Sequence, residues 1–310
     1  MTMTTLGRQA PDEIRAALKN SSVGLRLRMG PYVARIRSAL PSVADAVSKL
    51  YGAHTVACDT DFVDFDVAVR RPHSVRALWR PQVVFEFEGQ EPFNPLPGDQ
   101  GFPLLEWGLN WCVYGHCHQH MTLHAAVLER NGHALLLPAP SGSGKSTLCA
   151  ALTFSGWRLL SDELALIEPR RCELLPMPRP VSLKNASIDV IRRFAPRVEF
   201  GSMVEETAKG VVAHFAPPAA AVRASATPAA PGWIVFPKYV PAAPARLVRL
   251  ERSRAFMQLI ENAFNYDIFG AEGFDLLGSL LDRSACYSFE YGDLAEAMEL
   301  FERLGRGDIG

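Results

Sequence analysis

Short stretches of alternating apolar and polar residues run through the first hundred residues. Val23–Met29 alternates in this way, and so do the residues from Val63 to Val69 and from Val83 to Phe87. Strict alternation is typical of strands with one buried face, and turn residues separate these stretches. One short helix is predicted over Ser42–Tyr51, capped by its first residue. We therefore expect a small mixed α/β domain over residues 1–100.

The hydrophobic period changes after Pro92–Pro103, and we take this Pro-rich stretch as the domain boundary. Beyond it, apolar residues recur on one helical stripe, which predicts a buried helix. The stripe consists of Leu104, Trp107, Trp111 and Tyr114. The second predicted domain covers residues 101–310.

Apolar runs predict the next strands. His124–Leu128 and Ala134–Leu137 lie on either side of Asn131-Gly132, a pair of residues that is typical of a tight hairpin turn. Trp233–Phe236 predicts a further buried strand. The Ala/Pro-rich stretch Pro217–Pro231 predicts an irregular loop.

The last sixty residues contain two helical patterns and one strand pattern. Apolar residues between Phe256 and Phe264 have helical spacing, and those between Tyr287 and Tyr291 alternate. A final helix should begin after Asp293, which can cap it, with Glu296 three residues further on. Four aromatic residues at strand or helix spacing are predicted to lie in the core: Trp233, Phe236, Phe264 and Phe274.

The most informative stretch reads Ala-Leu-Leu-Leu-Pro-Ala-Pro-Ser-Gly-Ser-Gly-Lys-Ser-Thr, from Ala134 to Thr147. It matches the phosphate-loop pattern G-x-x-x-x-G-K-[ST], with Ala139 at a first position that mainly requires a small residue. An apolar strand precedes the loop, and a helical pattern follows it as far as Gly156. We expect the loop to bind a nucleoside triphosphate. The predicted nucleotide-binding residues are Ala139, Ser141, Gly142, Ser143, Gly144, Lys145, Ser146 and Thr147.

Phosphate binding explains these residue types. Gly142 and Gly144 let the backbone turn so that successive N–H groups converge on phosphate oxygens, and the following helix adds its positive end. Lys145 supplies a positive charge for the β- and γ-phosphates, and the Ser146 hydroxyl reaches Mg²⁺. We expect Lys145 to be exposed and to have no packing role.

An acidic pair follows the loop closely. Asp162 lies 17 residues after Lys145, and Glu163 is next to it. The predicted helix has about three turns, and the chain then reverses at Gly156 and returns as a strand, which brings the pair near the loop. Phosphoryl transfer needs one carboxylate to accept the proton of the acceptor hydroxyl and another to hold the metal ion. A solvated acidic turn at a strand end is the alternative.

The segment from His124 to Glu163 resembles the catalytic core of bacterial HPr kinase/phosphorylase. The resemblance lies in His124-Ala125 at the start of a strand, in Ser-Gly-x-Gly-Lys-Ser at Ser141–Ser146 and in Gly-x-Arg-Leu-x-x-Asp-acidic at Gly156–Glu163. Within this group the chain is similar to the HprK-related kinase A proteins. They share the loop, the Ser-Asp-Glu strand end and a Glu-Trp-Gly-Leu-Asn-Trp helix, found here at Glu106–Trp111.

The resemblance implies a fold, a reaction and roles for matching residues. The fold is akin to that of phosphoenolpyruvate carboxykinase, the reaction phosphorylates a serine of a small carrier protein, and ATP and Mg²⁺ are the cofactors. His124 would lie near the phosphates, and Lys145 would bind them. Asp162 would be the base that activates the acceptor hydroxyl. Ser146 would bind Mg²⁺, and Glu163, where the family usually has a second Asp, would assist the metal.

The chain departs from the family after this core. The bifunctional enzymes have a Glu-x-x-Gly-x-Gly-type signature that supports phosphorolysis and supplies a metal ligand. Here the corresponding stretch is Arg179-Pro-Val-Ser-Leu-Lys-Asn185. The third metal ligand is therefore unassigned, and nothing in the chain predicts phosphorolysis.

Composition and charge narrow the range of partners. Among 310 residues, 32 Lys and Arg balance 33 Asp and Glu, which gives a net charge of −1. This balance indicates neither nucleic acid nor an anionic membrane as a partner. No apolar run approaches 18 residues and the N-terminus is polar, so we expect neither a membrane span nor a signal peptide. The six cysteines lack a framework spacing, which predicts reduced thiols and a cytoplasmic location.

Two weaker signals have competing interpretations. A run of potential soft ligands could hold zinc, but its spacing is irregular and it crosses a predicted helix-to-strand transition, so we expect a polar helix end with His124 alone in the active site. The run consists of Cys112, His116, Cys117, His118, His120 and His124. Four residues in predicted loops could contact the nucleotide or a peptide acceptor, or be solvated loop polarity. They are Lys184, Asn185, Lys209 and His214.

The prediction is an α/β protein with a P-loop kinase core of the HPr kinase/phosphoenolpyruvate carboxykinase type. The expected activity is ATP-dependent phosphorylation of a hydroxyl, a serine on a small protein or peptide. One alternative is a nucleotide-gated binding or assembly protein with little or no kinase activity, and another is a small-molecule kinase. Asp162 favours a kinase, because a pure nucleotide switch needs no base beside the γ-phosphate. The acceptor, the choice between ATP and GTP, and the oligomeric state, a homo-oligomer included, stay open.

Overall fold

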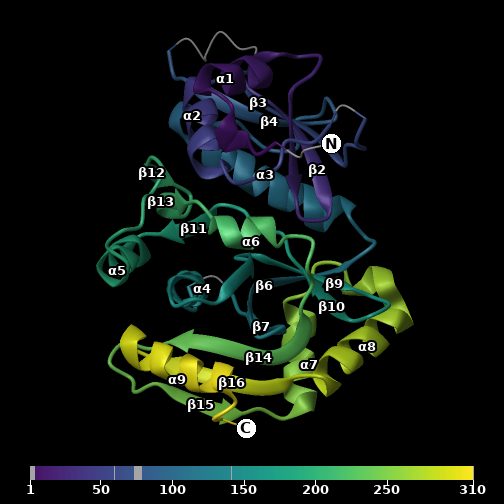
Figure 1. Ribbon diagram of the computed structural model, residues 1–310, viewed down its shortest axis with the longest axis vertical. Helices are drawn as coiled ribbons and strands as arrows, with labels where there is room; N and C mark the ends of the chain where they lie inside the picture. Colours follow the sequence, from purple (N-terminus) through teal and green to yellow (C-terminus); the bar gives the residue numbers. More distant parts are fainter. Residues whose placement is uncertain (1–3, 59, 73–78, 141, 310) are drawn as a thin grey trace. The chain divides into compact units, whose positions relative to one another are not determined.

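The protein is described by a computed structural model that covers residues 4–58, 60–72, 79–140 and 142–309 (Figure 1). The chain forms two compact units. The first comprises Met1–Val113, Arg179–Asn185 and Glu199–Arg223, and the second comprises Tyr114–Pro178, Ala186–Val198 and Ala224–Gly310. Helices and sheets occur in both units, so the predicted mixed α/β class is confirmed. The domain boundary at residue 100 stays a prediction.

The first unit contains a sheet with strand order β1-β2-β3-β4-β5 and a smaller sheet with order β11-β13-β12. The strands of the larger sheet are β1 (Leu25–Met29), β2 (Tyr32–Arg37), β3 (Phe65–Arg70), β4 (Gln82–Phe87) and β5 (Leu96–Pro97). Those of the smaller sheet are β11 (Val181–Lys184), β12 (Val204–Thr207) and β13 (Gly210–Phe215). The helices are α1 (Pro11–Lys19), α2 (Pro41–Leu50), α6 (Ala219–Arg223) and α3 (Gly101–His116), whose last three residues belong to the second unit. Among the described residues, 3₁₀ turns cover Leu6–Arg8 and Gly98–Gln100.

Alternation predicted three strands of the first unit, namely β1, β3 and β4. In β1, for example, Leu25, Leu27 and Met29 are buried and the residues between them are half-buried. Only one helix was expected before residue 100, and this was wrong, because α1 is also present. The start of α2 was also wrong. Pro41 is its first residue and Leu40 its N-cap, since the fixed φ of proline suits the first helical position.

The predicted helix after the Pro-rich stretch is α3, but its buried positions differ from the expected stripe. Leu105, Leu109 and Cys112 are buried, whereas Trp107 and Trp111 are only half-buried. The close approach of α3 to β4 explains the difference. A Cβ on Gly108 would lie 2.1 Å from the ring of Phe85, so the glycine lets the helix pack directly on that strand.

The second unit is built on a sheet with strand order β10-β9-β6-β7-β14-β16-β15, in which β8 also pairs with β6. Its strands are β6 (Met121–Arg130), β7 (His133–Pro138), β8 (Arg158–Ser161), β9 (Leu164–Glu168), β10 (Glu173–Leu175), β14 (Ala230–Tyr239), β15 (Arg246–Arg249) and β16 (Ala285–Tyr291). Its helices are α4 (Lys145–Phe154), α5 (Ala186–Phe194), α7 (Arg252–Glu261), α8 (Tyr266–Asp282) and α9 (Leu294–Arg306).

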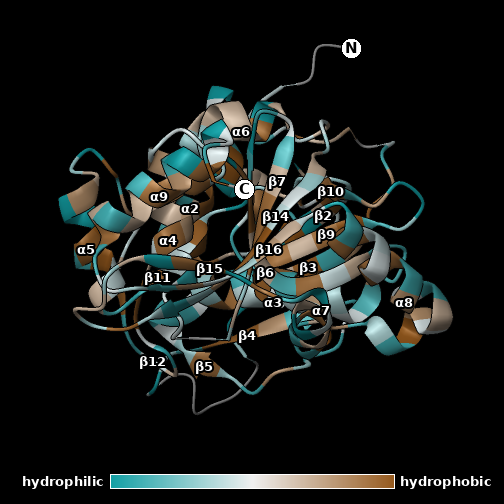
Figure 2. Ribbon diagram, turned by 90° about the horizontal axis from the view of Figure 1, so that it is seen from below, coloured by the Kyte–Doolittle hydropathy of each residue, from teal (hydrophilic) through white to brown (hydrophobic). Residues whose placement is uncertain are grey.

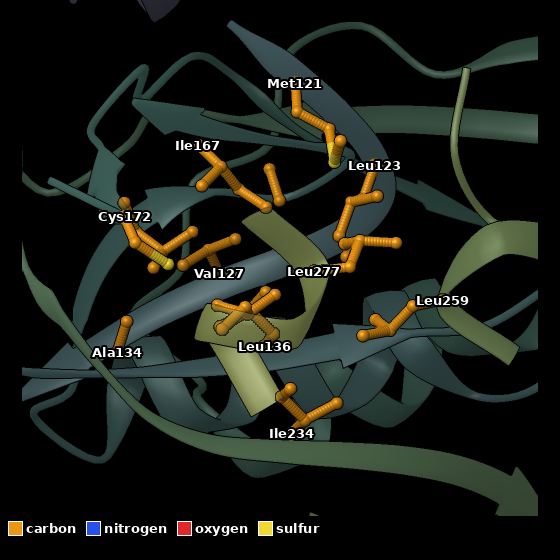
Figure 3. Close-up of a cluster of buried hydrophobic side chains, with 14 of the residues drawn as sticks. Met121, Leu123, Val127, Ala134, Leu136, Ile167, Cys172, Ile234, Leu259 and Leu277 are labelled. Carbon is orange, nitrogen blue, oxygen red and sulfur yellow. The ribbon is translucent and has the colours of Figure 1, made fainter. Parts of the chain in front are cut away.

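One face of this sheet packs against α7 and α8 (Figure 3). The central strands β7 and β14 are mainly apolar, as their brown colour in Figure 2 shows. Full burial of a large aliphatic side chain contributes roughly 1.5–3 kcal/mol, so this cluster is a main source of stability. Its members include Met121, Leu123, Val127, Leu136, Ile234, Leu259 and Leu277, each at most 2% exposed.

The other face carries α4 and α9. Trp157 contacts Trp233 of β14 and Phe301 of α9, with ring centroids 5.9 Å and 6.5 Å apart. Strands β7, β14 and β16 run parallel. Their carboxyl ends therefore lie at one edge of the sheet, which is where the α/β architecture places ligand sites.

The predicted hairpin turn and helix cap of this unit are confirmed. Asn131 and Gly132 both have positive φ, at 55° and 83°, and join β6 to β7 as the predicted hairpin. Asp293 caps α9, because its carboxylate accepts hydrogen bonds from the N–H groups of Ala295 and Glu296.

Other expectations for the later part of the chain were wrong. The stretch Pro217–Pro231 is not an irregular loop, since it contains α6 and the start of β14. Phe264 and Phe274 are 43% and 59% exposed rather than core residues. Phe264 lies in the link between α7 and α8, and Phe274 lies on the solvent side of α8. Helical spacing alone does not tell which side of a helix faces solvent.

Two observations concern the chain's environment. No helix among the described residues combines the length and apolarity needed to cross a membrane. All six cysteines are free thiols, and only Cys58 is exposed.

Candidate functional site

The predicted phosphate loop connects the end of β7 to the start of α4 in the second unit. Ala139, which replaces the first glycine of the pattern, is 3% exposed, so a small side chain suits this position. Pro140 and Gly142 are exposed, and Ser143, Gly144, Ser146 and Thr147 are half-buried. Ser141, also predicted to bind nucleotide, lies outside the described residues.

Two glycines give the loop its backbone path. Gly142 has φ +89° and Gly144 has φ +88°, a region that costs other residues roughly 1–2 kcal/mol. Gly144 is the N-cap of α4, and the first regular hydrogen bond of the helix runs from Leu148 N–H to its carbonyl oxygen over 3.0 Å. The N–H groups before Leu148 have no acceptor within the helix. They form the electropositive end that binds anions in other proteins.

Two tyrosines from neighbouring strands hold the loop, and sequence reasoning missed both. The Tyr239 N–H at the end of β14 donates to the Ser143 carbonyl oxygen over 3.0 Å. The Tyr291 hydroxyl at the end of β16 donates to the Gly144 carbonyl oxygen, also over 3.0 Å. Their position could have indicated this role, because both tyrosines end strands that are parallel to β7.

The expectation that Lys145 would be exposed is wrong, since it is only 6% exposed. Lys145 is the first residue of α4, and its side chain is buried at the start of this helix.

The acidic pair lies at a bend between β8 and β9, two strands that pair with successive parts of β6. Ser161 Oγ accepts the Leu164 N–H at 3.1 Å, and such side-chain bonds to nearby backbone favour a turn over a regular strand. The Glu163 carbonyl oxygen still accepts the Ala125 N–H at 3.1 Å. Asp162 is 8% exposed and Glu163 is half-buried. The pair is not a solvated turn.

Asp162 and Lys145 both act on one buried group, the thiol of Cys149 on α4. Burial raises the pKa of Cys149 well above its ordinary value, the Asp162 carboxylate raises it further, and Lys145 lowers it. Both charged groups therefore lie near enough to Cys149 to act on its thiol. Asp162 follows β8, which runs parallel to β7 because each is antiparallel to β6. The predicted acidic residue and the predicted phosphate-binding lysine thus share one end of the unit.

His124 lies on β6 at the same edge. The next residue, Ala125, pairs with Pro138, the last residue of β7. The His124 N–H donates to the Asn262 carbonyl oxygen over 2.7 Å, and its ring lies 5.9 Å from the ring of Phe264. Phe264 in turn stacks on Tyr114, with 4.4 Å between ring centroids.

Of the four polar residues expected in loops, two lie in strands and two in turns. Lys184 and His214 belong to the paired strands β11 and β13, so the prediction of loop context was wrong for them. His214 is 2% exposed and meets the ring of Phe102 edge-on. Asn185 follows β11 and Lys209 lies in the turn between β12 and β13, and the Asn185 amide donates to the Lys209 carbonyl oxygen over 3.1 Å. All four residues are in the first unit.

The chemistry of the loop residues fits a nucleoside triphosphate with Mg²⁺. Backbone N–H groups and Lys145 suit phosphate oxygens, and the Ser146 hydroxyl and a carboxylate of the acidic pair suit a hard cation. The described residues contain no group of three or more His, Cys, Asp or Glu side chains placed to hold a metal ion.

Comparisons with known proteins give a match to one family model and matches among solved structures. The family described as "SynChlorMet cassette protein ScmC" matches residues 106–182, a segment that includes the phosphate loop and the acidic pair. Among solved structures, the chain is similar to the Hpr(Ser) kinase/phosphatase from Coxiella burnetii. The identity is 13% and the TM-score 0.27, over 60% of this chain and 98% of that one. The curated proteins contain no match.

Proposed function

We propose that this protein is an ATP-dependent phosphotransferase, which moves the γ-phosphate of ATP to a hydroxyl group, a serine on a small protein or peptide. The observation that carries the proposal is the shared location of the phosphate loop, Lys145 and Asp162. The two loop glycines at positive φ support phosphate binding. The opposite influences of Asp162 and Lys145 on the Cys149 pKa support a base close to the bound phosphates.

In this proposal each residue has one task. The loop N–H groups and Lys145 bind the β- and γ-phosphates and neutralise charge that develops during transfer. Asp162 accepts the hydroxyl proton of the acceptor as its oxygen bonds to the γ-phosphorus. The bond from that phosphorus to the bridging oxygen breaks, and ADP keeps the electron pair. Ser146 and Glu163 would hold Mg²⁺, which shields the negative phosphate oxygens.

The proposed kinase core would be of the HPr kinase/phosphoenolpyruvate carboxykinase type. The antiparallel β6–β7 hairpin before the loop and the short return from α4 to the acidic pair are consistent with the sequence motifs from His124 to Glu163. His124 would contact the phosphates or the acceptor from the edge of β6. A cytoplasmic location also belongs to this proposal.

Two variants test the assignment of the acidic pair. Asp162→Asn keeps the shape of the side chain but removes the proton acceptor, so ATP affinity should stay within about twofold while transfer falls by roughly 10² or more. Glu163→Gln should raise the Mg²⁺ concentration needed for half-maximal transfer more than it lowers the rate at saturation. Calorimetry with Mg-ATP and transfer of γ-labelled phosphate to proteins encoded beside this chain measure both quantities.

The possible outcomes separate the candidate functions. Label on a protein serine with wild type, lost in Asp162→Asn, supports a protein kinase. Label on a small alcohol instead would identify a small-molecule kinase. ATP binding without any labelled acceptor would favour a nucleotide-gated binding protein, and transfer by Asp162→Asn at the wild-type rate would show that Asp162 is not the base.

A further inference from the structure

Tyr239 is a large aromatic residue that is 48% exposed although it is part of the sheet that carries the phosphate loop. It ends β14, and its N–H group is bonded to the Ser143 carbonyl oxygen. A Cβ on Gly144 would lie 3.0 Å from the Cβ of Tyr239. The backbone bond explains why the strand ends here, but any residue could make it. The exposed ring needs a separate explanation.

The ring of Tyr239 has a fixed support. It meets the ring of Tyr291 at 70°, with 5.6 Å between centroids. Tyr291 is 2% exposed and stacks on Phe289, with 5.1 Å between centroids and only 10° between the ring planes. The exposed ring therefore lies against a buried aromatic pair, and binding a flat ligand on it would cost little side-chain entropy.

Tyr239 and Asp162 lie on opposite sides of β7. Asp162 follows β8, which pairs with β6, and Tyr239 ends β14, which pairs with the other edge of β7. Three strand spacings separate β8 from β14, or about 14 Å. An extended nucleoside triphosphate spans such a distance. With its γ-phosphate near Asp162 and its other phosphates over the loop, its base would reach the side of Tyr239.

We propose that Tyr239 forms the base-binding subsite by stacking on the base of the bound nucleotide. This inference rests on the proposed nucleotide binding at the phosphate loop and adds the group that recognises the base. Stacking uses the π-face that every base has, so it discriminates weakly between bases. The subsite would therefore accept adenine and guanine with similar affinity.

Ligands with and without a base test the proposal. Calorimetry of the full-length chain with Mg-ATP and with magnesium tripolyphosphate compares binding of the whole nucleotide with binding of its phosphates alone. Tyr239→Ala should weaken ATP binding between about fivefold and about a hundredfold, the range that stacking of one base supplies. Tripolyphosphate binding should not change. Tyr239→Leu, which keeps apolar bulk at the position, should behave like Tyr239→Ala, and Tyr239→Phe should bind both ligands like wild type.

Phe274→Ala is the matched control, since Phe274 is an equally large ring, 59% exposed, on α8. It should leave both affinities unchanged. An equal loss of ATP and tripolyphosphate affinity in Tyr239→Leu would overturn the proposal, because Tyr239 would then act only by shaping the loop. Unchanged ATP affinity in both Tyr239→Ala and Tyr239→Leu would also overturn it. If wild type bound neither ligand, the proposed function itself would be wrong, and the base subsite with it.

Discussion

Lys145 combines a charged head group with a buried position, and this combination carries much of the site's chemistry. Its side chain is 6% exposed at the first position of α4, where the helix dipole is already positive. A second positive charge at this point is unfavourable without an anion nearby. In the proposed function, the phosphates of the bound nucleotide supply that anion.

Lys145→Ala should therefore weaken ATP binding by roughly tenfold or more, because the charge that contacts the β- and γ-phosphates is lost. Since the lysine is buried, the test needs a measurement of folding beside the calorimetric titration with Mg-ATP. We expect the melting temperature to stay close to that of wild type. The exposed Lys19→Ala on α1 serves as control and should bind ATP normally. Wild-type affinity in Lys145→Ala would mean that the loop does not bind ATP as proposed.

At the scale of elements, the loop depends on contacts between strand ends. Gly142 and Gly144 have nearly the same φ, yet their surroundings differ. Nothing lies within 4 Å of a Cβ on Gly142, whereas a Cβ on Gly144 would lie 2.3 Å from the Tyr291 hydroxyl. Gly142 is therefore needed for its backbone conformation alone. Gly144 is needed for its backbone conformation and also because Tyr291 of β16 approaches it closely.

This difference predicts unequal effects of two alanine substitutions. Gly142→Ala should lower the free energy of unfolding by about 1–2 kcal/mol through backbone strain. Gly144→Ala should cost the same strain plus about 1 kcal/mol, because the Tyr291 hydroxyl must move and lose its hydrogen bond. Urea unfolding measures both values, and Gly144→Ala/Tyr291→Phe should recover part of the second loss. Equal costs for the two single variants would contradict the Tyr291 contact.

The Glu-Trp-Gly-Leu-Asn-Trp motif acquires a structural explanation within α3. Glu106 and Asn110 lie one turn apart, and the Arg179 guanidinium donates to the Asn110 amide oxygen. The Glu106 carboxylate is 3.6 Å from the same guanidinium and accepts the Tyr51 hydroxyl at 2.6 Å. All three charged or amide side chains are buried. The motif and Arg179, far apart in sequence, form one polar network in the first unit.

Arg179→Leu should lower the free energy of unfolding by roughly 3–5 kcal/mol, because Glu106 would remain buried without its cationic partner. The measurement is urea unfolding followed by tryptophan fluorescence. Arg171→Leu is the control, since that side chain is 78% exposed and lies 4.0 Å from Glu173, and we expect less than about 0.5 kcal/mol. If Arg179→Leu and Glu106→Gln/Arg179→Leu both changed the free energy of unfolding only slightly, the network would contribute little to stability.

At the scale of the whole molecule, buried acidic groups make stability depend on pH. Burial raises the pKa of Cys286 to about 11, against smaller opposite effects of Arg249 and Arg252. Burial also raises the pKa of the Cys149 thiol and of the Tyr291 hydroxyl. In the unfolded chain a thiol loses its proton near pH 8.5. Above that pH the unfolded state binds fewer protons than the folded state, so stability falls as pH rises.

We therefore expect the urea midpoint to decrease between about pH 8.5 and pH 10.5, the window in which folded thiols keep protons that unfolded thiols lose. Cys286→Ala should make this decrease shallower, because one of the contributing groups is gone. A midpoint that rises over this range would contradict the direction of the pKa shifts.

The sequence by itself determined the features that depend on neighbouring residues. Asn131-Gly132 predicted a hairpin because both residues tolerate positive φ, and Asp293 predicted a helix start because its carboxylate reaches N–H groups two and three residues away. The phosphate-loop pattern could be recognised because such a loop requires glycine, lysine and serine at fixed spacing. These are short-range properties of the backbone, and they need no knowledge of the fold.

Only the tertiary structure decided which distant residues meet. Several features depend on residues that are far apart in the chain. They are the burial of Lys145, the hydrogen bonds of Tyr239 and Tyr291 to the loop, and the contact of Arg179 with α3. Likewise, the spacing of apolar residues along the chain did not determine that Phe264 is exposed. Spacing along a chain tells which side chains share a face, whereas strand order and helix packing decide what that face contacts.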